Sequence, residues 1–87
     1  MTRSVFSPAY AALRDSLVAA RRARGVTQVE LAGILGRPQS FVSKYERGER
    51  RLDLVEVVEI ATALGVDSHE FVTEVNKVMA ADNPQGL

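Results

Sequence analysis

The fold is decided by the stretch from Arg21 to Tyr45, which reads RRARGVTQVELAGILGRPQSFVSKY. Its pattern predicts two short helices joined by a tight turn. Thr27 and Glu30 have the spacing of a capping box, in which each side chain bonds the backbone N–H of the other residue. Gly36 then ends the first of these helices, because glycine readily adopts the positive φ found after a helix.

The second helix of the pair begins after Pro38, whose ring holds φ near the helical value. In the residues that follow, only Val42 and Tyr45 recur at the spacing of a buried helix face. The other side chains are therefore left to face a ligand. The two helices are predicted to cover residues 28–35 and 39–47.

Three further helices are expected around this pair. They cover residues 8–24, 54–64 and 68–81. In each, a capping residue precedes apolar residues that recur at helical spacing. The predicted buried face of the middle one consists of Leu54, Val57, Val58, Ala61 and Leu64. Asp67 and Glu70 have capping-box spacing at the start of the last one. The chain is therefore predicted to be all-α, with five helices in one compact domain.

The length of 87 residues suits a single domain. We expect a flexible N-terminus at 1–6, the domain at 7–81 and a disordered tail at 82–87. With no cysteine and His69 as the single histidine, neither a metal site nor a cofactor is expected, and nothing suggests an enzyme. No apolar run approaches the roughly 18 residues of a membrane span, and the first residues lack a signal-peptide pattern, so a cytoplasmic protein without membrane contact is expected.

Charge is unevenly distributed along the chain, although the net charge is zero. Residues 21–51 hold eight basic and three acidic side chains, whereas residues 52–87 hold one basic and seven acidic ones. Lys and Arg side chains attract duplex DNA by displacing counterions from its phosphates. The segment with the paired helices is thus the one suited to nucleic acid, and the acidic segment is expected to face away from it or toward a partner. Two merely solvated faces are the alternative.

Three motifs resemble the helix-turn-helix domain of the phage lambda repressor and Cro class, called the XRE family. They are GVTQVELA at 25–32, SFVSKYERG at 40–48 and IATALGV at 60–66. Each is weak alone, but together, in this order and spacing, they are specific. The resemblance covers about residues 13–72 and implies a lambda repressor-like DNA-binding domain, with the helix-turn-helix at the second and third helices. Double-stranded DNA is the implied partner.

The third helix is expected to enter the major groove with its first residues toward the bases. Gln39 opens this helix, and its amide can both donate and accept, which matches the N6 and N7 atoms of adenine. Its position also matches the leading glutamine that reads bases in several family members. The other expected base contacts are Ser40, Phe41, Ser43 and Lys44.

Phe41 is the unusual member of this set. Because its neighbour Val42 is assigned to the core, and consecutive helix residues rarely share full burial, the Phe41 ring is expected to be exposed toward DNA. An exposed ring there could pack on a thymine methyl group. The alternative is that the ring packs against the edge of the second helix.

Phosphate contacts are expected from Gln28, Arg37, Arg47, Arg50 and Arg51. Gln28 follows the cap of the second helix, where free backbone N–H groups favour an anion. It also matches the family glutamine that binds a phosphate and braces the recognition helix. Arg37 and Pro38 depart from the family pattern, which usually has an apolar residue and a Ser or Thr cap there, and this leaves the docking angle open.

Arg21 and Glu46 match an arginine of the first helix and a glutamate at the end of the third that form a partly buried salt bridge in this family. The resemblance therefore implies the same pair here. Removing one partner of a buried pair leaves an uncompensated charge. The expected role of both residues is structural rather than in DNA contact.

A homodimer is predicted because the last helix has more apolar surface than a five-helix core needs. Its expected interface consists of Phe71, Val72, Val75, Val78 and Met79. A second apolar patch is formed by Val5, Phe6 and Tyr10. A two-fold dimer would set its recognition helices roughly 34 Å apart and favour a palindromic operator. The alternative is that these residues complete the core of a monomer.

The sequence therefore indicates a sequence-specific DNA-binding transcriptional regulator, expected to act as a repressor that occupies a promoter. A controller protein of a restriction-modification operon is an alternative within the same class. An alternative from another class is the antitoxin of a toxin–antitoxin pair. In that case the apolar last helix and the acidic segment would bind a small protein toxin.

Overall fold

The computed structural model describes residues 7–82. Its five helices are α1 (Pro8–Ala23), α2 (Gln28–Leu35), α3 (Gln39–Glu46), α4 (Leu54–Leu64) and α5 (His69–Asp82). Within this part of the chain no strand is present, so the predicted all-α, five-helix fold is confirmed.

The segment boundaries need one adjustment. Asp82, expected to open the tail, is the last residue of α5. The flexible segment predicted at 1–6 and the tail residues 83–87 lie outside the described residues. Among the helices of the described part, none is both long enough and apolar enough to span a membrane.

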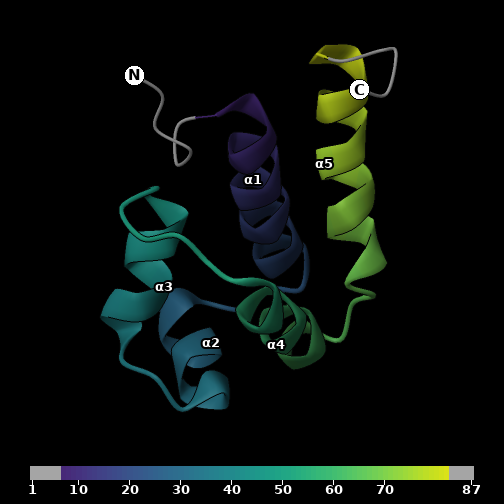
Figure 1. The fold of residues 1–87 in the computed structure, drawn as a ribbon. Coiled ribbons are helices and arrows are strands. Elements are labelled where there is room, and N and C mark those ends of the chain that lie inside the picture. Colours follow the sequence, from purple (N-terminus) through teal and green to yellow (C-terminus); the bar gives the residue numbers. More distant parts are fainter. Residues whose placement is uncertain (1–6, 83–87) are drawn as a thin grey trace.

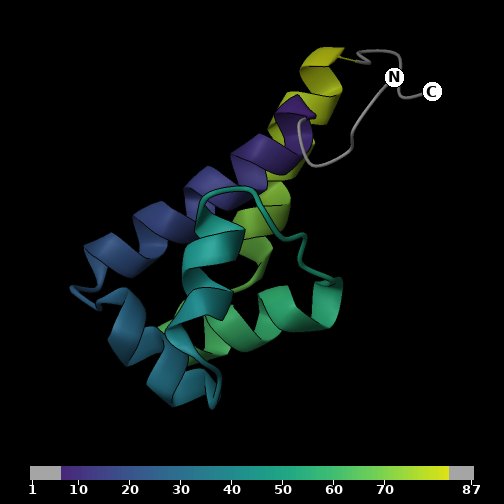
Figure 2. The same cartoon turned by 90° about the vertical axis from the view of Figure 1, so that its left-hand side faces the viewer.

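The helices form two groups that meet at α4. Helices α1 and α5 run side by side, while α2 and α3 lie together on the side of α1 away from α5 (Figure 1). Helix α4 closes one end of the molecule and packs against both α1 and α2 (Figures 1 and 2). This arrangement leaves one side of α3 without any of the other four described helices against it (Figure 2).

Local capping signals explain most of the helix boundaries. Thr27 and Glu30 form the expected capping box of α2, and Gly36 ends this helix with a φ of 68°. Asp53 and Glu56 form the corresponding box of α4. The positive φ of Gly36 turns the chain toward α3 within two residues, as a helix-turn-helix requires.

The expected capping box at Asp67 and Glu70 is not formed. The Asp67 carboxylate instead accepts a hydrogen bond from the backbone N–H of His69 at 2.9 Å. Because α5 begins at His69, Glu70 is only its second residue and lies one position too early to complete a box.

The core lies where α1, α2, α3 and α4 meet. Its largest fully buried side chains are Leu17, Leu31, Val42, Tyr45 and Ile60. The Tyr45 hydroxyl is buried without a hydrogen-bond partner among the described residues. Burial of the phenol raises the pKa of Tyr45, and the nearby Glu46 carboxylate adds to this rise.

The predicted buried face of α4 was partly wrong. Leu54 is 70% exposed and Val58 is 41% exposed, whereas Ile60, which the prediction omitted, is fully buried. The face that contacts the core is centred on Val57, Ile60, Ala61 and Leu64. Val58 therefore lies at its margin, and Leu54 stands outside it in the first turn.

Two residues expected on the surface belong to the interior. Phe71 is only 2% exposed and is part of the core, so it is removed from the predicted dimer interface. Tyr10 is also buried, and its hydroxyl accepts a hydrogen bond from the backbone N–H of Leu52 at 2.9 Å. Tyr10 therefore does not form an exposed patch with Val5 and Phe6, which lie outside the described residues.

Candidate nucleic-acid interface

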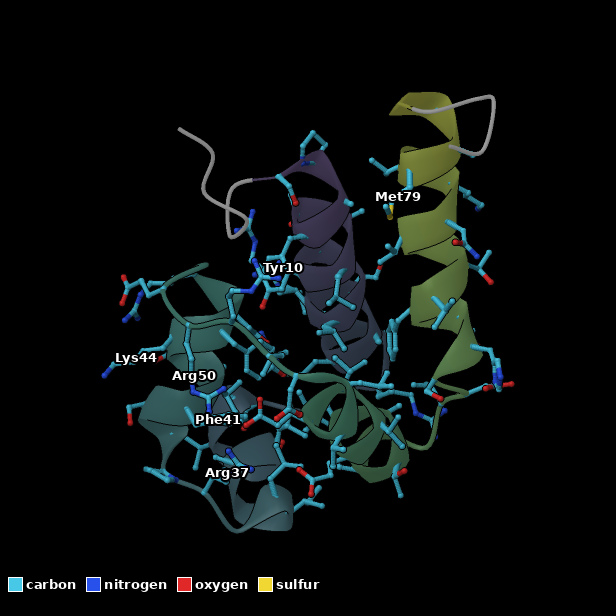
Figure 3. The ribbon with its side chains drawn as sticks, in the orientation of Figure 1. Tyr10, Arg37, Phe41, Lys44, Arg50 and Met79 are labelled. Carbon is cyan, nitrogen blue, oxygen red and sulfur yellow. The ribbon has the colours of Figure 1, made fainter. Side chains whose placement is uncertain are left out.

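The outer face of α3 carries four polar side chains at helical spacing. Gln39, Ser40 and Lys44 are exposed and Ser43 is half-buried. Lys44 points away from the body of the molecule (Figure 3). Positions i, i+1, i+4 and i+5 lie on one side of a helix, so the structure brings these four predicted base-contacting residues together on one surface.

The fifth predicted base contact, Phe41, is not on this surface. Its ring is 8% exposed and meets the ring of Tyr45 edge to face, with centroids 5.5 Å apart. The guanidinium carbons of Arg37 and Arg50 lie 4.3 and 4.8 Å from the Phe41 centroid. The expectation of an exposed ring was wrong, because side chains from the turns before and after α3 cover it.

Arg37 and Arg50 are held by one carboxylate, that of Glu56. Arg50 donates from Nη1 to Glu56 Oε1 at 3.0 Å and from Nη2 to Oε2 at 2.9 Å. Arg37 donates from Nη1 to Glu56 Oε2 at 3.2 Å, and its Nη2 lies 3.6 Å from Glu59. Both arginines, which are predicted phosphate contacts, are therefore paired with carboxylates in this structure.

The contacts of the Glu56 carboxylate favour its ionised form. Hydrogen bonding from Arg50 lowers the pKa of Glu56 to about 2, and the backbone N–H of Asp53 and the guanidinium of Arg37 act in the same direction against the effect of burial. The carboxylate is therefore ionised throughout the physiological pH range.

A second network connects the interior to the start of α3. Arg21 donates to Glu46 through Nε at 2.7 Å and through Nη2 at 3.0 Å. Both side chains are almost buried, with exposed fractions of 10% and 6%. The hydrogen bond to Glu46 raises the pKa of Arg21. This geometry is the bidentate pairing that guanidinium and carboxylate groups favour.

Gln28 extends this network toward the polar face of α3 that carries Gln39. Its Nε2 donates to Glu46 Oε1 at 2.8 Å, and its Oε1 accepts from Nε2 of Gln39 at 3.3 Å. Gln28 thus contacts both the last and the first residue of α3. In this arrangement it braces α3 at both ends.

The two remaining arginines of the predicted phosphate set are exposed. Arg47 pairs with Glu49 at 3.0 Å, but both side chains are 55% exposed, and pairs of this kind contribute little to stability. The Arg51 guanidinium lies 4.6 Å from the centroid of the Tyr10 ring. Both positive charges therefore remain accessible to an anion in solvent.

Sequence reasoning missed the central role of Glu56. Its spacing from Asp53 identified only the capping box, which is indeed formed. The contacts with Arg50 and Arg37 join residues that are six and nineteen positions apart. These separations follow no helical or strand period, so no sequence pattern indicates them.

Comparison with known proteins gives consistent matches to this arrangement. A family model described as helix-turn-helix matches residues 17–71. An uncharacterised HTH-type transcriptional regulator of Sinorhizobium fredii, y4dJ, is 42% identical over 53 residues, which are 61% of this chain and 69% of that protein.

Solved structures are similar over more of the chain. An XRE-family-like protein from Pseudomonas syringae pv. tomato is 47% identical with a TM-score of 0.76, over 80% of this chain and 85% of that one. The restriction-modification controller protein C.AhdI from Aeromonas hydrophila is 35% identical with a TM-score of 0.64, over 69% of this chain and 91% of that one.

Proposed function

This chain belongs to the XRE-type helix-turn-helix family of DNA-binding transcriptional regulators, and we propose that it is a sequence-specific repressor. One observation carries the proposal. The polar side chains of Gln39, Ser40 and Lys44 on α3 are exposed, whereas its apolar side chains are buried. One side of α3 also has none of the other described helices against it (Figure 2). A helix placed in this way can enter the major groove without disturbing the core.

The proposed division of roles follows exposure. Gln39, Ser40, Ser43 and Lys44 contact base edges, and Arg47 and Arg51 contact phosphates from the end of α3 and the loop after it. Gln28 lies beside Gln39 at the start of α2 and is half-buried, and its Nε2 carries a second N–H that can donate to a phosphate.

We further propose that two copies pair through the α4 groove and together bind a palindromic operator. The α4 groove is the surface formed by Ile34, Leu54, Val55 and Val58. These side chains are 60%, 70%, 66% and 41% exposed. A surface that pairs with its own copy about a two-fold axis needs only one such patch. The patch is contiguous and apolar, as the centre of such an interface should be.

Geometry favours the α4 groove over α5 as the dimer surface. Two recognition helices must lie roughly 34 Å apart to enter successive major grooves. The described part of the chain is 41 Å in its longest dimension, and α5 lies on the side of α1 away from α3. Helix α4 packs against α2, the partner of α3, whereas α5 packs against α1, so we propose the α4 surface as the one that keeps the two recognition helices closer together.

A controller of a restriction-modification operon is the second candidate, favoured by the similarity to C.AhdI over 91% of that protein. Both candidates read DNA by the same helix. They differ in the genes that lie beside the operator, so the position in the genome at which the operator sequence occurs distinguishes them.

Selection of bound duplexes from a random pool tests the proposal. The native protein is run beside Gln39→Ala and the control Asn76→Ala, which removes an exposed amide from α5. We expect a palindrome from the native protein and the control, and a pattern blurred at one position in each half-site from Gln39→Ala. Recovery of no sequence above background by the native protein would contradict the proposal and turn attention to a partner such as a toxin.

A further inference from the structure

The cluster around Glu56 lies beside the recognition helix and connects four consecutive segments of the chain. Arg37 comes from the turn before α3, Phe41 from α3 itself, Arg50 from the loop after α3, and Glu56 from the first turn of α4. Figure 3 shows Arg37, Phe41 and Arg50 grouped together. The cluster therefore borders the DNA-reading surface at both ends of α3.

Glu56 has a fixed position in this cluster. Its Oε1 accepts the backbone N–H of Asp53 at 3.0 Å, and its own backbone N–H donates to the Asp53 carboxylate at 2.8 Å. The capping box of α4 thus holds the carboxylate in place before either arginine contributes. Its side chain is only 11% exposed, which keeps water from competing with the two guanidinium groups.

The two arginines direct their terminal N–H groups toward protein acceptors. Both terminal nitrogens of Arg50 contact Glu56, and those of Arg37 contact Glu56 and Glu59. These are the groups that an arginine uses to bind a phosphate in a bidentate manner. The side chains are nevertheless 39% and 34% exposed, so release from the carboxylate would present two positive charges to DNA.

An arginine that binds phosphate strengthens binding to every sequence equally. Each phosphate contact steepens the salt dependence by about 0.9 in the slope of log K against log salt concentration. Phosphate contacts carry no direct sequence information, whereas base contacts do. Arginines withheld from phosphate therefore lower non-specific binding without removing any base contact.

We propose that Glu56 is a specificity-determining residue, which withholds Arg37 and Arg50 from the DNA phosphates so that the base contacts of α3 decide where the protein binds. The inference rests on the proposed function, because it concerns the balance between specific and non-specific DNA binding. We assign no base contact to Glu56. It acts through the two arginines.

Glu56→Gln is the direct test. Glutamine keeps the shape of the side chain and can still accept the Asp53 N–H, but it loses the charge that holds the arginines. Binding is measured against a 24-bp duplex of mixed sequence and against an operator duplex recovered by selection, over a series of salt concentrations. We expect non-specific affinity to rise about fivefold near 0.1 M salt, its salt slope to steepen by about 1 to 2, and the operator preference to fall.

The matched control is Glu59→Gln. It makes the same change of net charge on α4, but Glu59 is 52% exposed and only its 3.6 Å contact with Arg37 is lost. Non-specific affinity is expected to change less than about twofold in this variant. An equal rise in both variants would show that net charge alone is responsible and would overturn the inference.

Two further variants test whether the arginines mediate the effect. Adding Arg37→Gln and Arg50→Gln to Glu56→Gln should return non-specific affinity to the native level, and a rise that persists would overturn the inference. The two arginine substitutions in the presence of native Glu56 should leave the salt slope unchanged, and this test holds even if Glu56→Gln fails to fold. A slope reduced by about 2 in that variant would show that the arginines already bind phosphate.

The native protein separates this inference from the proposed function. If it binds neither duplex, the proposed function fails. If it binds both with a preference for the operator, and Glu56→Gln shows the same affinities and slope, only the role of Glu56 fails. Thermal melting of each variant, followed by circular dichroism, verifies that the proteins compared are folded.

Discussion

Gln28 donates a hydrogen bond from Nε2 to Glu46 Oε1 at 2.8 Å, and this contact joins the first residue of α2 to the last residue of α3. The same Glu46 oxygen accepts from Arg21 at 3.0 Å. On its other side, Gln28 accepts from Gln39. A buried ion pair is thereby connected through one amide to the residue that opens the recognition helix.

Loss of this ion pair should destabilise the fold strongly. Arg21→Met leaves the Glu46 carboxylate buried and unpaired, and we expect it to lower the free energy of unfolding by about 3 to 5 kcal/mol. Urea denaturation measures the change. The neighbouring exposed residue provides the control, since Arg22→Met should alter stability by less than about 0.5 kcal/mol. Equal effects of the two substitutions would contradict a special role for the pair.

Gln39→Ala should weaken operator binding by about 1 to 3 kcal/mol and relax the base preference at one position of each half-site. The reason is the loss of an amide that can pair with a base edge. Competition with operators altered one base pair at a time measures both effects. Unchanged affinity together with unchanged preference would show that Gln39 does not read a base.

Acid should reveal the contribution of Glu56 to stability. A carboxylate whose pKa falls to about 2 on folding stabilises the folded state above its unfolded pKa of roughly 4.3, and this stabilisation is lost as pH falls through the folded value. The native protein should therefore lose stability between pH 5 and 2. In Glu56→Gln, the decrease in the free energy of unfolding over this pH range should be smaller by about 1 to 3 kcal/mol. This figure allows for the partial exposure of the two arginines that contact Glu56. Urea titrations at pH 6, 4 and 2.5, with Glu59→Gln as the control, measure it. Parallel pH profiles of native protein and Glu56→Gln would contradict the assignment.

Removal of the Tyr45 hydroxyl should cost nothing or increase stability. This hydroxyl is fully buried without a hydrogen-bond partner among residues 7–82, and an unsatisfied polar group carries a desolvation penalty of about 1 to 3 kcal/mol. Tyr45→Phe keeps the ring and its contact with Phe41. Thermal melting should show an equal or higher midpoint, and a clearly lower one would mean that the hydroxyl is bonded in solution, for example to a buried water.

A charge in the α4 groove should separate the proposed dimer. Val55→Asp places a carboxylate at the centre of that surface, so sedimentation equilibrium should give the monomer mass, and operator affinity should fall. Met79→Asp is the matched control, because Met79 is also exposed, at 55%, but lies on α5. Dissociation of the Met79 variant while the Val55 variant stays dimeric would place the interface on α5.

The fold could be predicted from the sequence because its signals are local. Thr27 with Glu30 and Asp53 with Glu56 lie three residues apart, and the bonds they form lie within single turns of the chain. Gly36 adopts the left-handed conformation that its position between two helices requires. Each of these interactions is complete within a few residues, so the sequence pattern is sufficient to indicate it.

The candidate site could be predicted only in part, because side-chain contacts between separate segments decide exposure there. Phe41 was expected to face DNA on the argument that Val42 already occupies the buried position. The structure buries both, since Arg37 and Arg50 reach over the ring from the two ends of α3. The spacing of apolar residues within α3 cannot indicate that side chains from outside this helix cover the Phe41 ring.

The separation of the reading face from the core has a consequence for how this protein can evolve. Ser40 and Lys44 are exposed, so substitutions there carry little penalty in folding, and under the base contacts proposed above we expect them to alter operator preference. Gln39 is different, because its amide is bonded to Gln28. A lineage that exchanges Gln39 should therefore tend to exchange Gln28 as well, whereas Ser40 and Lys44 should drift independently.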